Sequence, residues 1–168
     1  TSTLLSVDDT AMLEQVLATT PTRLVVFESP TNPVLKVVDI KRITALAKAH
    51  GALTLLDNTL GGLHNHGEFE VDLYAHSLTK YASGHGDVMG GALVGRGELI
   101  DGLREDLTNL GPTLDPHAAY LLLRGLPTLP LRVEAQQRTA TEIAGYLAEH
   151  PAIAAVHLSR LAEEIVLW

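Results

Sequence analysis

Apolar residues along the chain fall into short continuous runs that alternate with stretches of helical spacing. The runs are of strand length and are bounded by glycine, proline or polar residues, which is typical of buried strands. They are Leu24–Glu28, Ala52–Leu56, Val71–Ala75 and Val88–Val94. Apolar residues three and four apart predict helices over residues 8–18, Asp39–His50, Glu98–Leu110, Pro116–Leu123 and Arg132–His150.

The order of these elements predicts the fold class. Strand, helix and strand with short connections indicate a right-handed parallel βαβ unit. The last strand follows too short a connection for a crossover, so we expect it to be antiparallel to its neighbour. Gly125 and Pro127 should break the helix that begins at Pro116, and Pro151 should end the last helix. The sequence therefore predicts an α/β fold with a mostly parallel sheet flanked by helices.

Composition narrows the class of protein. With 168 residues the chain is long enough for one well-buried domain. A net charge of -8 without any basic run argues against nucleic-acid binding. The absence of cysteine removes disulfides, thiolate metal sites and a cysteine nucleophile, and is compatible with a reducing cytoplasm. Neither a signal peptide nor an apolar run of about 20 residues is visible, so we expect a soluble cytoplasmic protein and no membrane partner.

Polar side chains follow three of the predicted strands, where open α/β sheets bind their ligands. They are Asn32 after the first strand, Asp57 and Thr59 after the second, and Ser77, Thr79 and Lys80 after the third. An amine, an acid and several hydroxyls suit pyridoxal 5'-phosphate (PLP). This cofactor needs a lysine for its Schiff base, an acid at its pyridine nitrogen and hydrogen-bond donors for its phosphate.

Four segments carry a resemblance to a known family. They are Glu28–Pro33 (ESPTNP), Asp57–Thr59 (DNT), His76–Tyr81 (HSLTKY) and Gly84–Gly91 (GHGDVMGG). In this order they resemble the signatures of the Cys/Met-metabolism PLP-dependent enzymes, which include cystathionine γ-synthase, cystathionine γ- and β-lyases and methionine γ-lyase. Leu121–Arg132 is similar to a further family segment. The resemblance spans about Val7 to Val156 and implies the fold of the aspartate aminotransferases, that is, fold type I.

The resemblance also implies roles for single residues. Lys80 matches the Schiff-base lysine, which moves the Cα proton, and Asp57 matches the partner of the pyridine nitrogen. Ser77 and Thr79 match phosphate ligands. Thr59 matches a residue packed against the ring. Asn32 matches the asparagine near the ring hydroxyl and the substrate carboxylate.

The implied activity is that of a carbon–sulfur lyase or γ-synthase acting on sulfur amino acids, by elimination or replacement at Cβ or Cγ. A homo-oligomer, a dimer of dimers, is implied as well. Residues 1–126 would form the core of the PLP-binding large domain. Residues 127–168 would form a linking helix and the start of a C-terminal region.

The sequence departs from the family in several places. Family members are more than twice as long, so we expect the chain alone to bind the cofactor poorly and to be weakly active or inactive. Leu60-Gly61-Gly62 replaces a more rigid family segment, which predicts a looser loop. Residues 158–168 show no recognisable family counterpart.

Three alternative interpretations were weighed. Ser77-Leu78-Thr79-Lys80 satisfies the S-x-x-K motif of serine hydrolases, but the companion S-D-N and K-T-G motifs are absent. A truncated or degenerate family member could serve as a non-catalytic scaffold. The histidines at positions 64, 66, 76 and 85 could suggest a metal, but we interpret those at 64 and 66 as solvated residues of a flexible loop, and expect no metal.

Overall fold

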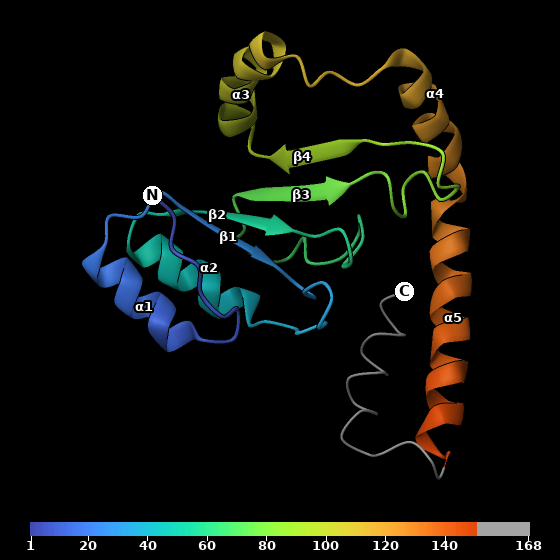
Figure 1. Cartoon of the computed structure of the whole chain (residues 1–168), viewed down its shortest axis with the longest axis horizontal. Helices are drawn as coiled ribbons and strands as arrows, with labels where there is room; N and C mark the ends of the chain where they lie inside the picture. Colours follow the sequence, from blue (N-terminus) through green and yellow to red (C-terminus); the bar gives the residue numbers. More distant parts are fainter. Residues whose placement is uncertain (151–168) are drawn as a thin grey trace. The chain divides into compact units, whose positions relative to one another are not determined.

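A computed structural model of the chain describes residues 1–150. The helices and strands are α1 (Thr10–Thr19), β1 (Leu24–Glu28), α2 (Ile40–Ala49), β2 (Leu53–Asp57), β3 (Leu73–Ser77), β4 (Gly91–Gly95), α3 (Gly97–Leu110), α4 (Pro116–Gly125), the 3-10 turn η1 (Leu126–Thr128) and α5 (Leu129–Ala148) (Figure 1). None of the described helices combines the length and apolar character that a membrane span requires.

The chain forms two compact units. The first unit holds residues 1–76 and 91–113, and it contains nearly all of the sheet. Among the described residues, the second unit holds 77–90 and 114–150, and it contains α4 and α5. The expected division into residues 1–126 and 127–168 concerns the domains of the whole protein and stays a prediction. Residues 151–168 of the second domain lie outside the described residues.

The sheet has the order β1-β2-β3-β4, with β1 and β2 parallel and β2 and β3 parallel. Figure 1 shows β4 running opposite to β3, as the short connection predicted. In this register Glu28 and Ala75 flank Asp57 on the two neighbouring strands. The carboxyl ends of β1 and β2 therefore meet at one edge of the sheet, and Asp57 is the last residue of β2.

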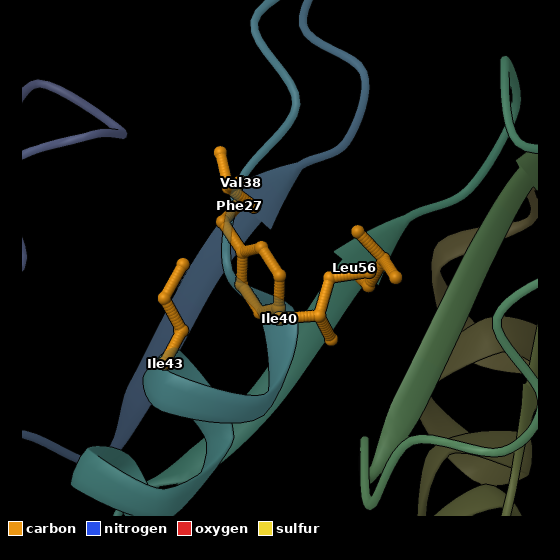
Figure 2. Packing of buried hydrophobic residues seen from close by; sticks show 5 residues of the cluster. All are labelled: Phe27, Val38, Ile40, Ile43 and Leu56. Carbon is orange, nitrogen blue, oxygen red and sulfur yellow. The ribbon is translucent and has the colours of Figure 1, made fainter.

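Helix α2 packs on the sheet through a cluster of five buried apolar side chains. The cluster consists of Phe27 and Leu56 from the strands and Val38, Ile40 and Ile43 from α2 and the segment before it (Figure 2). Leu56 is 0% exposed. A second cluster, formed by Leu17, Leu46, Ala47 and Ala52, joins α1 to α2. Aspartate caps begin both helices, because Asp9 accepts a hydrogen bond from the backbone of Met12 and Asp39 from that of Arg42.

The predicted elements are all present, but several boundaries were wrong. Strand β3 begins two residues later than expected and includes Ser77. Strand β4 begins at Gly91 rather than Val88. Helix α4 continues to Gly125 rather than Leu123, and the expected break follows there, since the 3-10 turn η1 with Pro127 separates α4 from α5. Helix α5 begins at Leu129 instead of Arg132. The expected helix stop at Pro151 and the expectation for residues 158–168 lie outside the described residues.

Candidate active site

Asp57 is held at the end of β2 by the residue two positions later. Its Oδ1 accepts hydrogen bonds from the backbone N–H of Thr59 (3.0 Å) and from the Thr59 hydroxyl (2.6 Å). Among residues 1–150, no group donates a hydrogen bond to the second oxygen, Oδ2. The half-buried carboxylate is thus fixed in orientation and keeps one oxygen for a further donor.

The loop after Asp57 is tied together by Asn58, which is 1% exposed. The Asn58 amide donates to the carbonyl oxygens of Gly62 (2.9 Å) and Asn65 (3.0 Å). Its oxygen lies 2.7 Å from Nδ1 of His66. A side chain at Gly61 would overlap the Asn58 oxygen and would lie 2.8 Å from His66 Nδ1, so only glycine fits there.

The loop is therefore not the loose segment that the sequence predicted. His66 in particular is not a solvated loop histidine, since it is half-buried and bonded to Asn58. Burial lowers the pKa of His66 below its ordinary value, although the nearby Glu68 acts to raise it. The hydroxyl of Tyr74 donates to the His66 carbonyl (2.8 Å), which joins this end of the loop to β3.

His76 is a second histidine near Asp57, and our sequence analysis assigned it no role at this edge of the sheet. It is buried at 8% exposure in β3. The Asp57 carboxylate and a backbone hydrogen bond with Asn58 both act to raise the pKa of His76, but burial outweighs them and the pKa lies below its ordinary value. The His76 imidazole thus lies within electrostatic range of the candidate carboxylate. The strand register puts Asp57 beside Ala75, the residue before His76, and could have indicated that His76 lies near Asp57.

Asn32 lies in the loop that follows β1, at the same edge of the sheet as Asp57. The loop is closed by Thr31, whose hydroxyl accepts a hydrogen bond from the backbone of Lys36 (3.0 Å). The Asn32 N–H donates to a carboxylate oxygen of Glu28, the last residue of β1 (3.0 Å). The Asn32 side chain is exposed.

Thr79 closes the turn that carries Lys80, in the second unit. Its hydroxyl accepts a hydrogen bond from the N–H of Gly90 (3.0 Å) and donates to the Gly90 carbonyl (3.3 Å). The N–H of Leu78 donates to the same carbonyl (2.9 Å). Residues 77–90 therefore form a loop closed at both ends, and the Thr79 hydroxyl is used in closing it.

The backbone of Lys80 lies in a hydrogen-bonded turn. Its N–H donates to the carbonyl of Ser77 (3.3 Å), and its own carbonyl accepts from the N–H of Gly84 (3.1 Å). The Lys80 side chain is exposed and takes part in none of the ion pairs between described residues, whereas Lys36 and Lys48 are paired with Asp8 and Glu70. Among residues 1–150, Lys80 is thus a primary amine that no carboxylate neutralises.

The donor set fits PLP in its chemistry. The uncommitted oxygen of Asp57 suits a protonated pyridine nitrogen, and the unpaired amine of Lys80 suits an aldehyde. The described part of the chain contains no group of three or more histidine, aspartate or glutamate side chains arranged to hold a metal ion.

Comparison with known sequences identifies the family that the chain resembles. The sequence profile of the family described as Cys/Met metabolism PLP-dependent enzyme matches residues 1–165. The match corrects the expectation that residues 158–168 have no family counterpart, since it continues to residue 165. The L-methionine gamma-lyase of Pseudomonas putida is 41% identical over 152 residues, which are 86% of this chain and 38% of that protein.

Solved structures agree with the sequence comparison. The cystathionine gamma synthase of Xanthomonas oryzae pv. oryzae, in complex with cystathionine, matches with a TM-score of 0.82 and 37% identity, over 95% of this chain and 43% of that one. The cystathionine gamma-lyase of Lactobacillus plantarum, complexed with L-serine, matches with a TM-score of 0.81 and 38% identity, over 89% and 40%. The chain spans about two fifths of the length of the relatives it matches. The expected fold type I architecture is confirmed over this partial region.

Proposed function

Because the chain belongs to the Cys/Met-metabolism family of PLP-dependent enzymes, we propose that the protein it represents is a carbon–sulfur lyase or γ-synthase acting on sulfur amino acids. Bound PLP would supply an electron sink for carbanions at the substrate's Cα. The reaction is an elimination or a replacement at Cβ or Cγ. Lys80, Asp57, Thr59, Ser77, Thr79 and Asn32 are the residues to which we assign roles in it.

Asp57 is assigned to the pyridine nitrogen. A carboxylate that accepts a hydrogen bond from a protonated ring nitrogen keeps that nitrogen charged. The observation that carries the proposal is the state of this carboxylate, with Oδ1 fixed by Thr59 and Oδ2 uncommitted. Thr59 serves two purposes in this assignment, since it orients Asp57 and packs beside the ring.

Lys80 is assigned as the covalent anchor and as the group that moves the proton of the substrate's Cα. An amine acts as a nucleophile and as a base only when it is unprotonated and not held by a carboxylate. The absence of an ion pair to Lys80 among residues 1–150 meets the second condition. The turn through Ser77 and Gly84 restricts the backbone from which the amine extends.

The hydroxyls of Ser77 and Thr79 are assigned to the cofactor phosphate, and Asn32 to the substrate carboxylate. Thr79 has a single hydroxyl proton, which it gives to the Gly90 carbonyl over 3.3 Å. A hydrogen bond of this length is weak, so redirecting the proton to a phosphate oxygen costs little. The exposed amide of Asn32 keeps its donors for a ligand.

The test is turnover of sulfur amino acids by the full chain with added PLP, followed as 2-oxo acid release for elimination and as a new thioether for replacement. We expect Lys80→Ala to abolish both products and Lys41→Ala, an exposed lysine of α2, to leave them unchanged. The alternative that the chain is a non-catalytic scaffold predicts no covalent cofactor on Lys80 even at millimolar PLP. Turnover that survives Lys80→Ala would refute the assignment.

A further inference from the structure

A single arginine of α5 holds the segment that follows Lys80. The Arg132 guanidinium donates hydrogen bonds to the carbonyl oxygens of Tyr81 (2.7 Å), Ala82 (3.3 Å) and Gly125 (3.0 Å). Its Nε donates to the hydroxyl of Thr128 (3.0 Å). One cation therefore connects two backbone positions next to Lys80 with the junction between α4 and α5. We call these contacts the Arg132 clasp.

Two glycines make room for the clasp. A side chain at Gly84 would overlap the Arg132 guanidinium, and Gly84 also has a φ of +69°, which favours glycine. A Cβ at Gly125 would lie 2.5 Å from the carbonyl oxygen of Ser83 and 2.7 Å from that of Ala82. Contacts this short with backbone atoms do not occur in proteins, so Gly125 is restricted to glycine by the close approach of residues 82 and 83. Glycine at position 84 is favoured by its positive φ and leaves room for the guanidinium.

The partners of Arg132 explain why arginine stands at this position. It takes part in none of the ion pairs between described residues, and it donates to three carbonyls and a hydroxyl. Reaching four acceptors in different directions requires the planar, five-donor guanidinium, because a lysine ammonium is a single point with three donors. Hydrogen bonds from a charged donor are also stronger than neutral ones.

Apolar packing supports the same segment from a second side. Ala82 and Val88 are buried against Leu122 of α4. Ala82 thus contacts α4 with its side chain while its carbonyl accepts from Arg132. The 81–84 segment is thus held by two different kinds of interaction, and the clasp acts directly on the carbonyl of the residue after Lys80.

We propose that Arg132 is a positioning residue for Lys80. The Tyr81 carbonyl that it binds lies one residue beyond Lys80, and the N–H of Gly84 closes the turn onto the Lys80 carbonyl (3.1 Å). Fixing this turn reduces the conformations from which the lysine amine extends, which favours the one that meets the cofactor aldehyde. The inference rests on the proposed role of Lys80 as the cofactor anchor.

The experiment compares Arg132→Ala, Arg132→Lys and the matched control Arg138→Ala, an exposed arginine further along α5. Covalent PLP on Lys80 is trapped with borohydride and quantified as a function of PLP concentration and pH. Losing one or two charge-assisted hydrogen bonds should raise the PLP concentration needed for half-occupancy by about 10- to 100-fold. Arg132→Lys should restore part of the loss, millimolar guanidinium should rescue Arg132→Ala in part, and the control should match the parent.

Amide hydrogen exchange at Ser83 and Gly84, whose N–H groups close the turn, separates this inference from the proposed function. If the parent protein never carries PLP on Lys80, the proposed function fails. Faster exchange in Arg132→Ala but not in Arg138→Ala would still show that the clasp orders this turn. The inference would be overturned if amide exchange is unchanged in Arg132→Ala. It would also be overturned if Arg132→Ala lowers the overall stability but leaves the Lys80 occupancy and its pH dependence unchanged.

Discussion

The replacement of Asn58 by alanine tests how the loop after Asp57 is held. The buried Asn58 side chain takes part in three hydrogen bonds, two donated to the carbonyls of Gly62 and Asn65 and one with Nδ1 of His66. Alanine keeps the backbone and removes all three. The chain directly after Asp57 would then lose the contacts that fix its path.

The structure gives the size of the expected effect. A hydrogen bond contributes about 1 kcal/mol net to stability, which sums to about 3 kcal/mol for three. At the exposed Asn65, water can take the place of the lost Asn58 amide donor, which lowers the energetic cost of the substitution. The half-buried His66 ring loses its hydrogen-bond partner, which raises that cost. We therefore expect Asn58→Ala to lower the free energy of unfolding by about 2–3 kcal/mol, a large share of the roughly 5–15 kcal/mol typical of a domain.

The assay is urea denaturation of the full chain, with Asn65→Ala as the matched control. The Asn65 amide donates one hydrogen bond, to the Gly61 carbonyl, from an exposed position in the same loop. Its removal should cost about 1 kcal/mol or less. A double-mutant cycle of Asn58→Ala with His66→Ala should give a coupling energy of about 1 kcal/mol, because the two side chains are in contact.

The reasoning fails if Asn58→Ala and Asn65→Ala are equally mild, because the Asn58 side chain would then not tie the loop. A loss of stability without coupling would locate the effect in the two carbonyl contacts instead, and the contact with His66 would then contribute nothing.

Two further predictions concern the first unit. Leu56→Ala should lower the free energy of unfolding by about 2–5 kcal/mol, because it opens a cavity in the cluster under the sheet, whereas Leu4→Ala, at 98% exposure, should change it little. The unfolding free energy should also fall as the pH drops from 7 towards 5. Burial lowers the pKa values of His66 and His76, so the unfolded chain takes up protons near pH 6.5 that the folded chain does not bind. In urea titrations His66→Gln should flatten this dependence, and an unchanged or steeper profile in His66→Gln would contradict the assignment.

Much of the fold follows from local signals in the sequence. Prolines at positions 21 and 30 bound the apolar run of β1, and its limits were predicted to the residue. Strand β3 was displaced because Asp72 does not join the ladder. Its carboxylate instead accepts hydrogen bonds from the N–H and the hydroxyl of Thr54, both at 2.9 Å. The hydrophobic pattern does not indicate where a side chain takes the place of a backbone acceptor.

The contacts that hold the site were harder to predict than its residues. Motifs indicated Asp57 and Lys80, but not the residues that fix them. Asn58 reaches His66 across eight positions of irregular loop, and Arg132 reaches Tyr81 across 51 positions. Gly61 suggested looseness in the sequence because glycine is flexible, whereas in the structure it permits a close contact. Such contacts depend on the folded path of the chain, which periodicity does not describe.

The central claim, that Lys80 anchors the cofactor, can be tested by mapping the lysine to which PLP becomes attached. The chain has four lysines, at positions 36, 41, 48 and 80, so a digest after borohydride reduction separates them clearly by mass. We expect the reduced cofactor on the peptide that contains Lys80, with less of it in Asp57→Asn at the same PLP concentration. Cofactor spread over the other three lysines, or equal labelling after Asp57→Asn, would contradict the account.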